Sequence, residues 1–147
     1  MILIEPTIKE FMISDAINTF PDECCGFVFG LEHKGENRTL TDVLRVDNSG
    51  EGDKRRRFVI SSKDYVKAEE FALQKNLQLL GVYHSHPNHP AIPSEHDRVA
   101  AQPYFSYLIL SIENGNFSSL RSWKLNDEFQ FEEETVGNFQ LINQIIT

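Results

Sequence analysis

The sequence predicts an α+β domain, a β-sheet flanked by helices. Its 147 residues are close to the size of one domain, which buries about two thirds of the surface of its unfolded chain. Segments with apolar residues at helical spacing are interspersed with strand-length apolar runs, and Asn114-Gly115 and Asn126-Asp127 are turn signals between the last of these runs. Apolar residues make up 40% and charged residues 24% of the chain, which is typical of globular domains and argues against disordered and disulfide-scaffold classes.

Apolar spacing and helix-breaking residues define the elements of the first part of the chain. Ile13, Ala16, Ile17 and Phe20 recur at helical spacing, and Pro21 ends that helix. The dense apolar run CCGFVFGL has the composition of a strand buried on both faces. The expected elements are, in order, a strand at Ile2–Glu5, a helix from Pro6 to Phe20, a strand at Cys24–Leu31, a turn at Lys34–Asn37 and a return strand at Thr39–Val46.

The second part begins with a polar loop at Asp47–Arg57, which has too little apolar content to be core. Its basic run Lys54–Arg57 is typical of a solvated loop, and in an acidic protein it also suits the acidic surface of a partner. The next helix is expected to bury Tyr65, Ala68, Phe71 and Ala72. The expected elements are a short strand at Phe58–Ile60, a helix from Ser62 to about Asn76 capped by Ser61, a strand at Gln78–Ser85, a helix from Ser94 to about Gln102, and strands at Ser106–Ile112, Phe117–Leu125 and Glu128–Glu134.

One domain is expected over residues 1–134, with residues 135–147 as its C-terminal tail or short helix. The net charge of −8 disfavours nucleic acid and anionic membranes as partners. No export signal or membrane-length apolar run is visible, and the adjacent Cys24 and Cys25 are poorly placed for a disulfide. We therefore expect a cytoplasmic protein.

Two histidines are the centre of the predicted functional site. His84 and His86, in GVYHSHP, lie two residues apart on a predicted strand, so both imidazoles face the same side. Asp97 follows His86 by eleven residues and lies one turn into the helix that begins at Ser94. The intervening loop can bring its carboxylate to the two rings. Two histidines and one carboxylate leave a fourth tetrahedral position for water, as in catalytic zinc sites.

Each of these fragments also has a purely structural interpretation. Paired histidines on a strand are often surface residues or satisfied core groups, and Ser94 with Asp97 has the spacing of a helix-capping box. Their combination, with a proline-rich loop between them, favours a metal site. Hydrolysis would also require a base for the proton of water. Glu23, at the border of the most apolar strand, is the candidate base, although a surface glutamate after a helix is an equally good interpretation of its position.

With these residues, the sequence resembles the JAMM/MPN+ (JAB domain) zinc metallopeptidases, in particular the small prokaryotic branch of the CysO-cysteine peptidase (Mec+) type. The similarity extends over nearly the whole chain, to about Glu134. It implies the α/β/α-like, cytidine-deaminase-like fold of JAB/MPN domains, with a mixed curved sheet flanked by helices. The residues that carry it are Pro21, Glu23, Cys25 and Gly26 in PDECCGF, the run Gly81–Pro87, and Pro93, Ser94 and Asp97.

The resemblance also implies residue roles. His84, His86 and Asp97 would bind one zinc ion per chain, with water as the fourth ligand. Glu23 would be the general base and later the proton donor, and Ser94 would help to stabilise the tetrahedral oxyanion. Family members hydrolyse the peptide or isopeptide bond after the C-terminal Gly-Gly of ubiquitin or ubiquitin-like proteins, and bacterial members often act on sulfur-carrier proteins of that fold. Such a carrier is the partner that the resemblance implies.

The same sequence also allows other functions to be compared with this one. The short loop HPNHPAIPSEHD, with no Cys or His after Asp97, favours the bacterial form, in which a C-terminal amino acid such as cysteine is removed, over the polyubiquitin-cleaving branch. The main alternative is a non-catalytic MPN-type scaffold that binds a ubiquitin-like partner. A thiol peptidase is disfavoured because Cys24 and Cys25 lie in an apolar strand, and a zinc nucleobase deaminase because its signature is absent. His89 and His96 are expected to be solvated loop residues.

Overall fold

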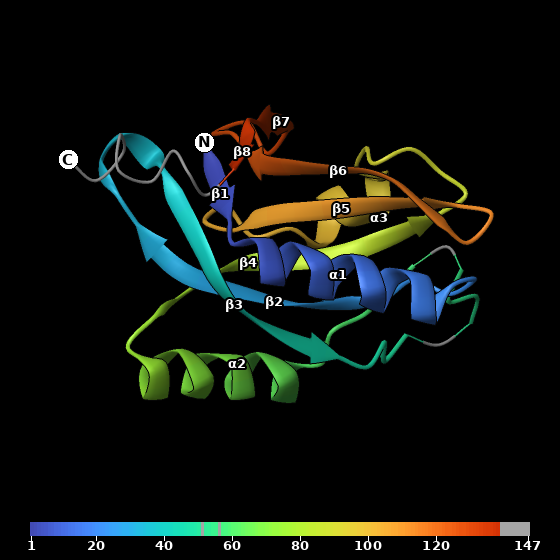
Figure 1. The fold of residues 1–147 in the computed structure, drawn as a ribbon, viewed down its shortest axis with the longest axis horizontal. Coiled ribbons are helices and arrows are strands. Elements are labelled where there is room, and N and C mark those ends of the chain that lie inside the picture. Colours follow the sequence, from blue (N-terminus) through green and yellow to red (C-terminus); the bar gives the residue numbers. More distant parts are fainter. Residues whose placement is uncertain (51, 56, 139–147) are drawn as a thin grey trace.

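The computed structural model describes residues 1–50, 52–55 and 57–138, and these form one mixed sheet with helices on both faces (Figure 1). The predicted α+β class is confirmed. The elements are β1 (Ile2–Ile4), α1 (Pro6–Thr19), β2 (Cys25–Glu32), the 3-10 turn η1 (Lys34–Glu36), β3 (Arg38–Val46), α2 (Ser62–Lys75), β4 (Gln78–Pro87), α3 (Glu95–Ala100), β5 (Ser106–Glu113), β6 (Asn116–Leu125), β7 (Phe131–Glu134) and β8 (Val136–Asn138).

The described strands are arranged in the order β7-β6-β5-β4-β2-β3-β1-β8. Strand β4 lies in the middle of this order, antiparallel to β2 on one side and parallel to β5 on the other. The long apolar run of β4 fits this position, because a central strand is covered on both faces. The strand that carries both histidines is therefore paired on both sides.

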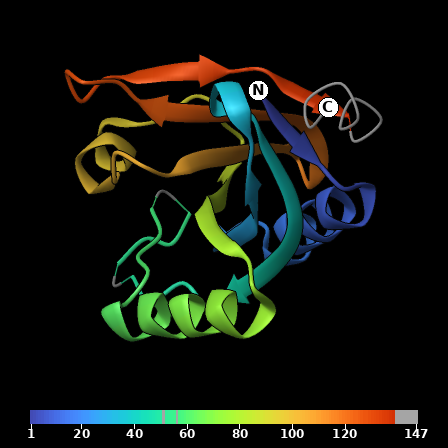
Figure 2. The same ribbon diagram turned by 90° about the vertical axis from the view of Figure 1, so that its left-hand side faces the viewer.

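The two strands at opposite ends of this order, β7 and β8, follow one another in the chain. Strand β7 pairs with β6 and β8 pairs with β1, yet only Thr135 separates β7 from β8. The carbonyl of Thr135 also accepts a hydrogen bond from the N–H of Ile2, at 2.8 Å. The sheet consequently curls until its first and last strands meet, as the view in Figure 2 shows.

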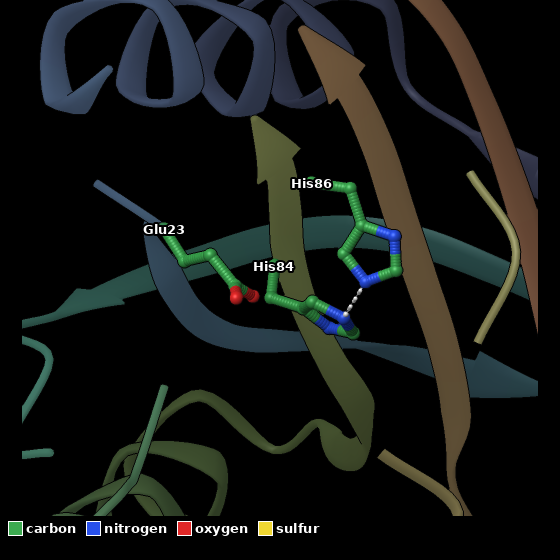
Figure 3. Close-up of side chains that lie close together, drawn as sticks. All are labelled: Glu23, His84 and His86. Atoms are coloured by element: carbon green, nitrogen blue, oxygen red, sulfur yellow. Dashed lines mark hydrogen bonds between the residues drawn. The ribbon is translucent and has the colours of Figure 1, made fainter. Parts of the chain in front are cut away.

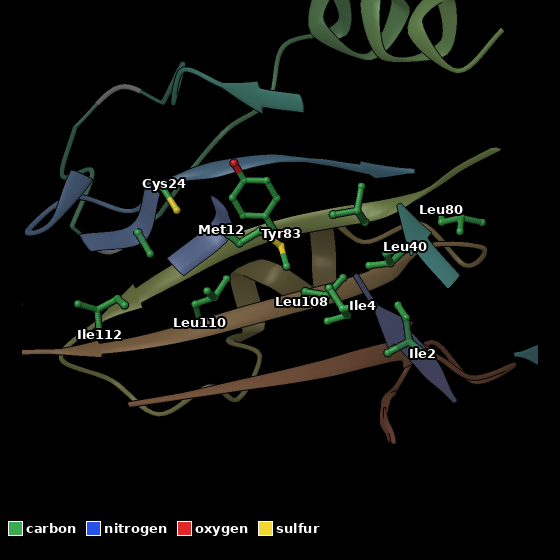
Figure 4. Close-up of a cluster of buried hydrophobic side chains, with 12 residues drawn as sticks. Ile2, Ile4, Met12, Cys24, Leu40, Leu80, Tyr83, Leu108, Leu110 and Ile112 are labelled. Atoms are coloured by element: carbon green, nitrogen blue, oxygen red, sulfur yellow. The ribbon is translucent and has the colours of Figure 1, made fainter. Parts of the chain in front are cut away.

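Alternate residues of the central strands supply two apolar cores, one on each face of the sheet. Tyr83 belongs to the core under α1 and Val82 to the core under α2. Figure 4 shows the first of these cores, which joins Met12 of α1 to side chains from β1 and from the central strands. Large apolar side chains buried in this way contribute roughly 1.5–3 kcal/mol each. His84 has the parity of Val82, so the histidines lie on the α2 face.

Helix α1 directs three of its four predicted core residues inward, since Ile13, Ala16 and Phe20 all belong to or pack against the core. Ile17 was expected to face the core, but it is 40% exposed, whereas Asp15 is buried. The hydroxyl of Tyr83 donates to Asp15 Oδ2 at 2.7 Å, and Arg45 Nε donates to Asp15 Oδ1 at 2.9 Å. The ring of Tyr83 in turn occupies the space that a side chain at Gly26 would need. This polar cluster lies on the buried side of the helix, where the hydrophobic pattern predicts only apolar side chains.

The short strand expected at Phe58–Ile60 is not formed, and this prediction was wrong. The segment is held mainly by the loop beside it: Val59 O accepts from Ser49 N–H, and Val59 N–H donates to the side chain of Asn48. One backbone bond and one side-chain bond do not make a ladder. The segment nevertheless lies at the functional site, because the ring of Phe58 stacks on His84 with centroids 4.4 Å apart.

The last elements are shorter than expected. Asn126 Oδ1 accepts hydrogen bonds from the N–H groups of Glu128 and Gln130, so the turn extends to residue 130 and β7 begins only at Phe131. Helix α3 ends at Ala100. Of the segment 135–147 that was expected as a C-terminal tail or short helix, Val136–Asn138 forms β8, and residues 139–147 lie outside the described part of the chain. None of the described helices is long and apolar enough to cross a membrane.

Candidate metal centre

The pairing of β2 with β4 brings three side chains together at the end of the central strand. Cys25 pairs with His84 in antiparallel register, so Glu23 enters the site from the segment just before β2, two residues ahead of Cys25. His84 and His86 project from β4 on the same face, as the alternation of strand residues predicts. Figure 3 shows the carboxylate of Glu23 pointing toward the two imidazoles.

Asp97 completes a close cluster with the two histidines. The Nε2 atoms of His84 and His86 are 3.2 Å apart, and Asp97 Oδ2 lies 3.4 Å from the first and 3.2 Å from the second. All three side chains are buried. Two nitrogen atoms and one oxygen atom from two elements thus lie close together.

The start of α3 orients the carboxylate of Asp97. Ser94 is the N-cap: its Oγ accepts from the N–H of Asp97 at 3.1 Å, and its own N–H donates to Asp97 Oδ2 at 2.8 Å. Burial raises the pKa of Asp97, but the two imidazoles and this backbone N–H outweigh it and hold that pKa well below its usual range. Asp97 is therefore ionised, which a metal ligand must be.

The proline-rich loop orients His86 from the other side. His86 Nδ1 lies 2.9 Å from the carbonyl oxygen of Pro90, so Nδ1 carries the proton and Nε2 is left free to bind a cation. The loop itself is anchored, because the indole N–H of Trp123 donates to the carbonyl of Ala91 at 3.0 Å. A carbonyl acceptor behind a ligating histidine is a regular feature of metal sites.

Glu23 is a buried carboxyl group beside this cluster. Its side chain is buried, and Oε1 has no hydrogen-bond partner among the described residues. Burial, and secondarily the negative charge of Asp97, raise the pKa of Glu23 to about 9. Burial also lowers the pKa of His84, whose Nδ1 is likewise without a hydrogen-bond partner. Such groups are costly to bury without a cation or a bound ligand near them.

These residues fit a zinc ion. A tetrahedral site with bonds of about 2.0–2.1 Å has ligand atoms about 3.3–3.4 Å apart. The three separations between His84, His86 and Asp97 are 3.2, 3.2 and 3.4 Å. Glu23 also has a carboxylate oxygen within 4.8 Å of a nitrogen of each histidine. The donor set is nitrogen and oxygen, which suits zinc, and Glu23 is close enough to act on a molecule held there.

Two cavities meet at this cluster. A groove of about 580 Å³ is open to Glu23, His86 and Ser94. A second cavity, of about 270 Å³, lies against His84 and Asp97 and is walled mainly by apolar and aromatic side chains, including Phe58 and Tyr107. Glu23 and Ser94 line the groove and not the aromatic cavity. The cluster therefore lies between two cavities, and of these the candidate base Glu23 is open only to the groove.

Comparison with known families identifies the fold. Residues 7–126 match the family described as prokaryotic homologues of the JAB domain. The chain belongs to the JAB/MPN (JAMM) family. A curated relative from Pyrococcus furiosus, named desampylase, is 31% identical to this JAB domain over 114 residues, covering 76% of this chain and 72% of the relative.

Solved structures agree with this assignment. A protein from Desulfitobacterium hafniense, solved in solution, superposes on this JAB domain with a TM-score of 0.81 and 27% identity, over 94% of this chain and 92% of that one. A protein from Salinibacter ruber gives a TM-score of 0.71 and 30% identity, over 92% and 90%. A JAB1/MPN domain protein from Archaeoglobus fulgidus shares the fold at a TM-score of 0.55 and 13% identity, over 94% and 96%.

Sequence reasoning did not assign a role to Ser85, which lies between the two histidines. Its side chain faces away from them, and its Oγ accepts a hydrogen bond from the N–H of Cys24 at 2.8 Å. The N–H of Ser85 donates to the carbonyl of Cys24 at 3.2 Å. These bonds fasten the residue after Glu23 to β4. A serine flanked by two candidate ligands was the only signal available.

The cysteines have no part in the cluster. Cys24 and Cys25 are both free and buried. Burial raises the pKa of Cys25 to about 12 and raises that of Cys24 further. A thiol that stays protonated is a poor nucleophile, so the structure supports the expectation that these residues pack and do not react. His89 and His96 are exposed, as expected, and lie at the groove and at the aromatic cavity respectively.

Proposed function

We propose that this protein is a zinc-dependent metallopeptidase that hydrolyses the peptide or isopeptide bond after the C-terminal Gly-Gly of a ubiquitin-like or sulfur-carrier protein. The observation that carries the proposal is the convergence of His84, His86 and Asp97. The buried carboxyl group of Glu23 lies next to them, and Glu23 and His86 line the same groove. Membership of the JAB/MPN family and the likeness to a desampylase support the choice of substrate class.

His84, His86 and Asp97 are the proposed zinc ligands. Zinc bound there would lower the pKa of a water molecule to about 7 and polarise the carbonyl of the scissile bond. The ligands are held ready for this: a carbonyl behind His86 fixes its tautomer, and the helix cap fixes the carboxylate of Asp97. Preorganised ligands of this kind require no rearrangement when the ion binds.

Glu23 is the proposed general base and acid. Its carboxylate takes a proton from the attacking water and delivers it to the leaving nitrogen. Its burial suits both steps, because a desolvated carboxylate holds a proton firmly, and a nearby cation would offset this enough for the carboxylate to form. The hydrogen bonds between Ser85 and Cys24 hold the backbone from which Glu23 projects.

Ser94 is the proposed donor to the developing oxyanion. Its Oγ already accepts one hydrogen bond from Asp97 N–H, which leaves the hydroxyl proton free to donate. The residue is exposed in the groove that Glu23 and His86 also line. A preset donor at such a position typically contributes about 10²–10³ in kcat.

The carrier tail is proposed to lie along the extended segment at Phe58–Ile60. Val59 directs its N–H and C=O to residues 48 and 49, so the corresponding groups of Phe58 and Ile60 face the other way and make no backbone hydrogen bond with the described residues. A Gly-Gly tail has no side chains to fill pockets and would be held by such backbone groups. The segment leads to the cluster, because Phe58 stacks on His84.

The test is to compare a Gly-Gly-ended ubiquitin-like carrier bearing a C-terminal extension with a free peptide of the same terminal sequence. We expect cleavage after the second glycine, with kcat/KM for the carrier larger by orders of magnitude, because binding of the folded body positions the bond. Products are read by mass. Equal rates would leave a general peptidase, and zinc-loaded protein that binds the carrier without cleaving it would identify the scaffold function instead.

A further inference from the structure

The groove in front of Glu23 contains one arginine. Arg55 lines it together with Glu23, His86 and Ser94, and it is the single Lys or Arg side chain among the described residues that border this groove. Its guanidinium has no ion pair with any carboxylate in the described ranges, although the net charge of the chain is −8. An arginine left without a partner in a cavity is available to an anionic ligand.

The backbone beside Arg55 is attached to the site. The N–H of Glu23 donates to the carbonyl of Lys54 at 2.7 Å, and the N–H of Arg55 donates to Asp53 Oδ1 at 3.0 Å. The side chain of Asn48 holds the same loop, through the carbonyls of Glu23 and Arg57. The loop that carries the arginine is thus bonded to the residue that carries the proposed base.

The position of Glu23 shows which side of the scissile bond this groove receives. Glu23 must reach the leaving nitrogen to protonate it, and it lines this groove and not the aromatic cavity. The leaving group therefore occupies the groove with Arg55. In an amino acid joined through its α-nitrogen, the carboxylate carbon is two bonds from that nitrogen, so its negative charge would lie in the same space.

We infer that Arg55 binds the α-carboxylate of the leaving amino acid, and that the enzyme therefore selects carriers whose leaving residue ends in a free carboxylate. The inference rests on the proposed function and adds a specificity-determining residue to it. A planar guanidinium can donate two parallel hydrogen bonds to a carboxylate, which gives both affinity and orientation. A leaving group without that carboxylate, such as a C-terminal amide or a lysine side chain within a protein, would lose this contact.

The experiment uses one carrier with two extensions, Gly-Gly-Ala as the free acid and as the C-terminal amide. We expect the wild-type protein to prefer the free acid by about tenfold in kcat/KM, because the amide loses a hydrogen bond between charged groups at a site that is open to water. The Arg55→Gln variant should lose the preference, chiefly through a higher KM for the free acid. Arg57→Gln, the same change in the same loop but outside the groove, should keep it.

The outcomes separate this inference from the function on which it rests. Cleavage of both substrates at equal rates by the wild type, or an unchanged preference in Arg55→Gln, would overturn the role of Arg55 while leaving the peptidase intact. Cleavage of neither substrate would overturn the proposed function. Equal melting temperatures of wild type and both variants would show that the change in preference does not come from a change in folding.

Discussion

The N–H of Cys24 donates to the Oγ of Ser85 at 2.8 Å, across the two strands that meet at the candidate metal centre. Ser85 is fully buried, and its two neighbours in the chain are the proposed zinc ligands His84 and His86. The bond therefore fixes the distance between the strand that carries the ligands and the segment that carries Glu23. It makes Ser85 a positioning residue that touches no substrate.

Ser85→Ala should lower kcat by about tenfold to a hundredfold, because small displacements of a catalytic group have effects of this size. The unfolding free energy should fall by about 1–3 kcal/mol, since the N–H of Cys24 loses its buried acceptor. Zinc content should not change. Ser106→Ala, which removes a buried hydroxyl that accepts from Arg38 far from Glu23, is the control and should lose stability without loss of kcat. Normal kcat in Ser85→Ala would remove the positioning role.

Glu23→Gln should retain zinc and the fold but lose about 10²–10⁴ in kcat, which is the range that general acid–base catalysis supplies. Glutamine keeps the size of the side chain and cannot accept the proton. Metal content by atomic emission and turnover of the carrier substrate are the measurements. Loss of zinc together with activity would instead make Glu23 a ligand. This outcome has to be tested, because a carboxylate oxygen of Glu23 lies within 4.8 Å of a nitrogen of each histidine.

Protein purified without chelator should contain about one zinc ion per chain, and His86→Ala should lose most of it. The control is His33→Ala, since His33 makes its hydrogen bond to Thr39 on the strands away from the cluster. Wild-type protein that stays free of metal after zinc is supplied would contradict the proposed site and favour the scaffold function.

The stability of the metal-free protein should depend on pH through Glu23. Its pKa is about 9 in the folded state against 4.5 as the ordinary value, so the folded state binds this proton more tightly and stability falls as pH rises through that interval. His84, whose pKa is lowered, contributes a slope of the opposite sign, which fades as pH rises above its ordinary pKa of 6.5. Between about pH 7 and pH 8 the slope from Glu23 reaches up to about 1.4 kcal/mol per pH unit.

Thermal melting of metal-free wild type and Glu23→Gln at these two pH values measures that slope. The wild type should lose more stability on going to the higher pH, because the glutamine variant has no proton to release. Other titrating groups are common to both proteins and cancel in the comparison. Parallel melting temperatures across this range would show that the folded state leaves the carboxyl of Glu23 close to its ordinary pKa.

The sequence predicted most of the site because its geometry follows from local rules. Alternation along a strand places His84 and His86 on one face, and a capping signature places Asp97 one turn into a helix. The structure confirms both placements. Glu23 and the histidines are far apart in the sequence, so no local pattern shows that they are close in space. The prediction of this contact depended on the family resemblance.

The wrong predictions concern features that depend on tertiary contacts and not on local rules. Ile17 was assigned to the core by its apolarity, but it is 40% exposed. Asp15 of the same helix is buried instead, through a hydrogen bond from Tyr83 that nothing in the helical pattern shows. Phe58–Ile60 has the composition of a strand, but a strand also requires a partner strand, and among the described residues only Val59 forms hydrogen bonds here, to the loop residues Asn48 and Ser49. Tertiary contacts decided each case.

Because β7 and β8 are one nearly continuous stretch of chain, the end of the described chain covers the outer side of β1, on which another polypeptide could otherwise add a strand. The same arrangement joins the first residues of the domain to its last ones through the bond from Ile2 to Thr135. During synthesis, one side of β1 therefore stays unpaired until residue 138 has left the ribosome. Truncation after Glu134 would leave that side permanently open, and the expected consequence is self-association of the shortened chain and poor recovery of soluble protein.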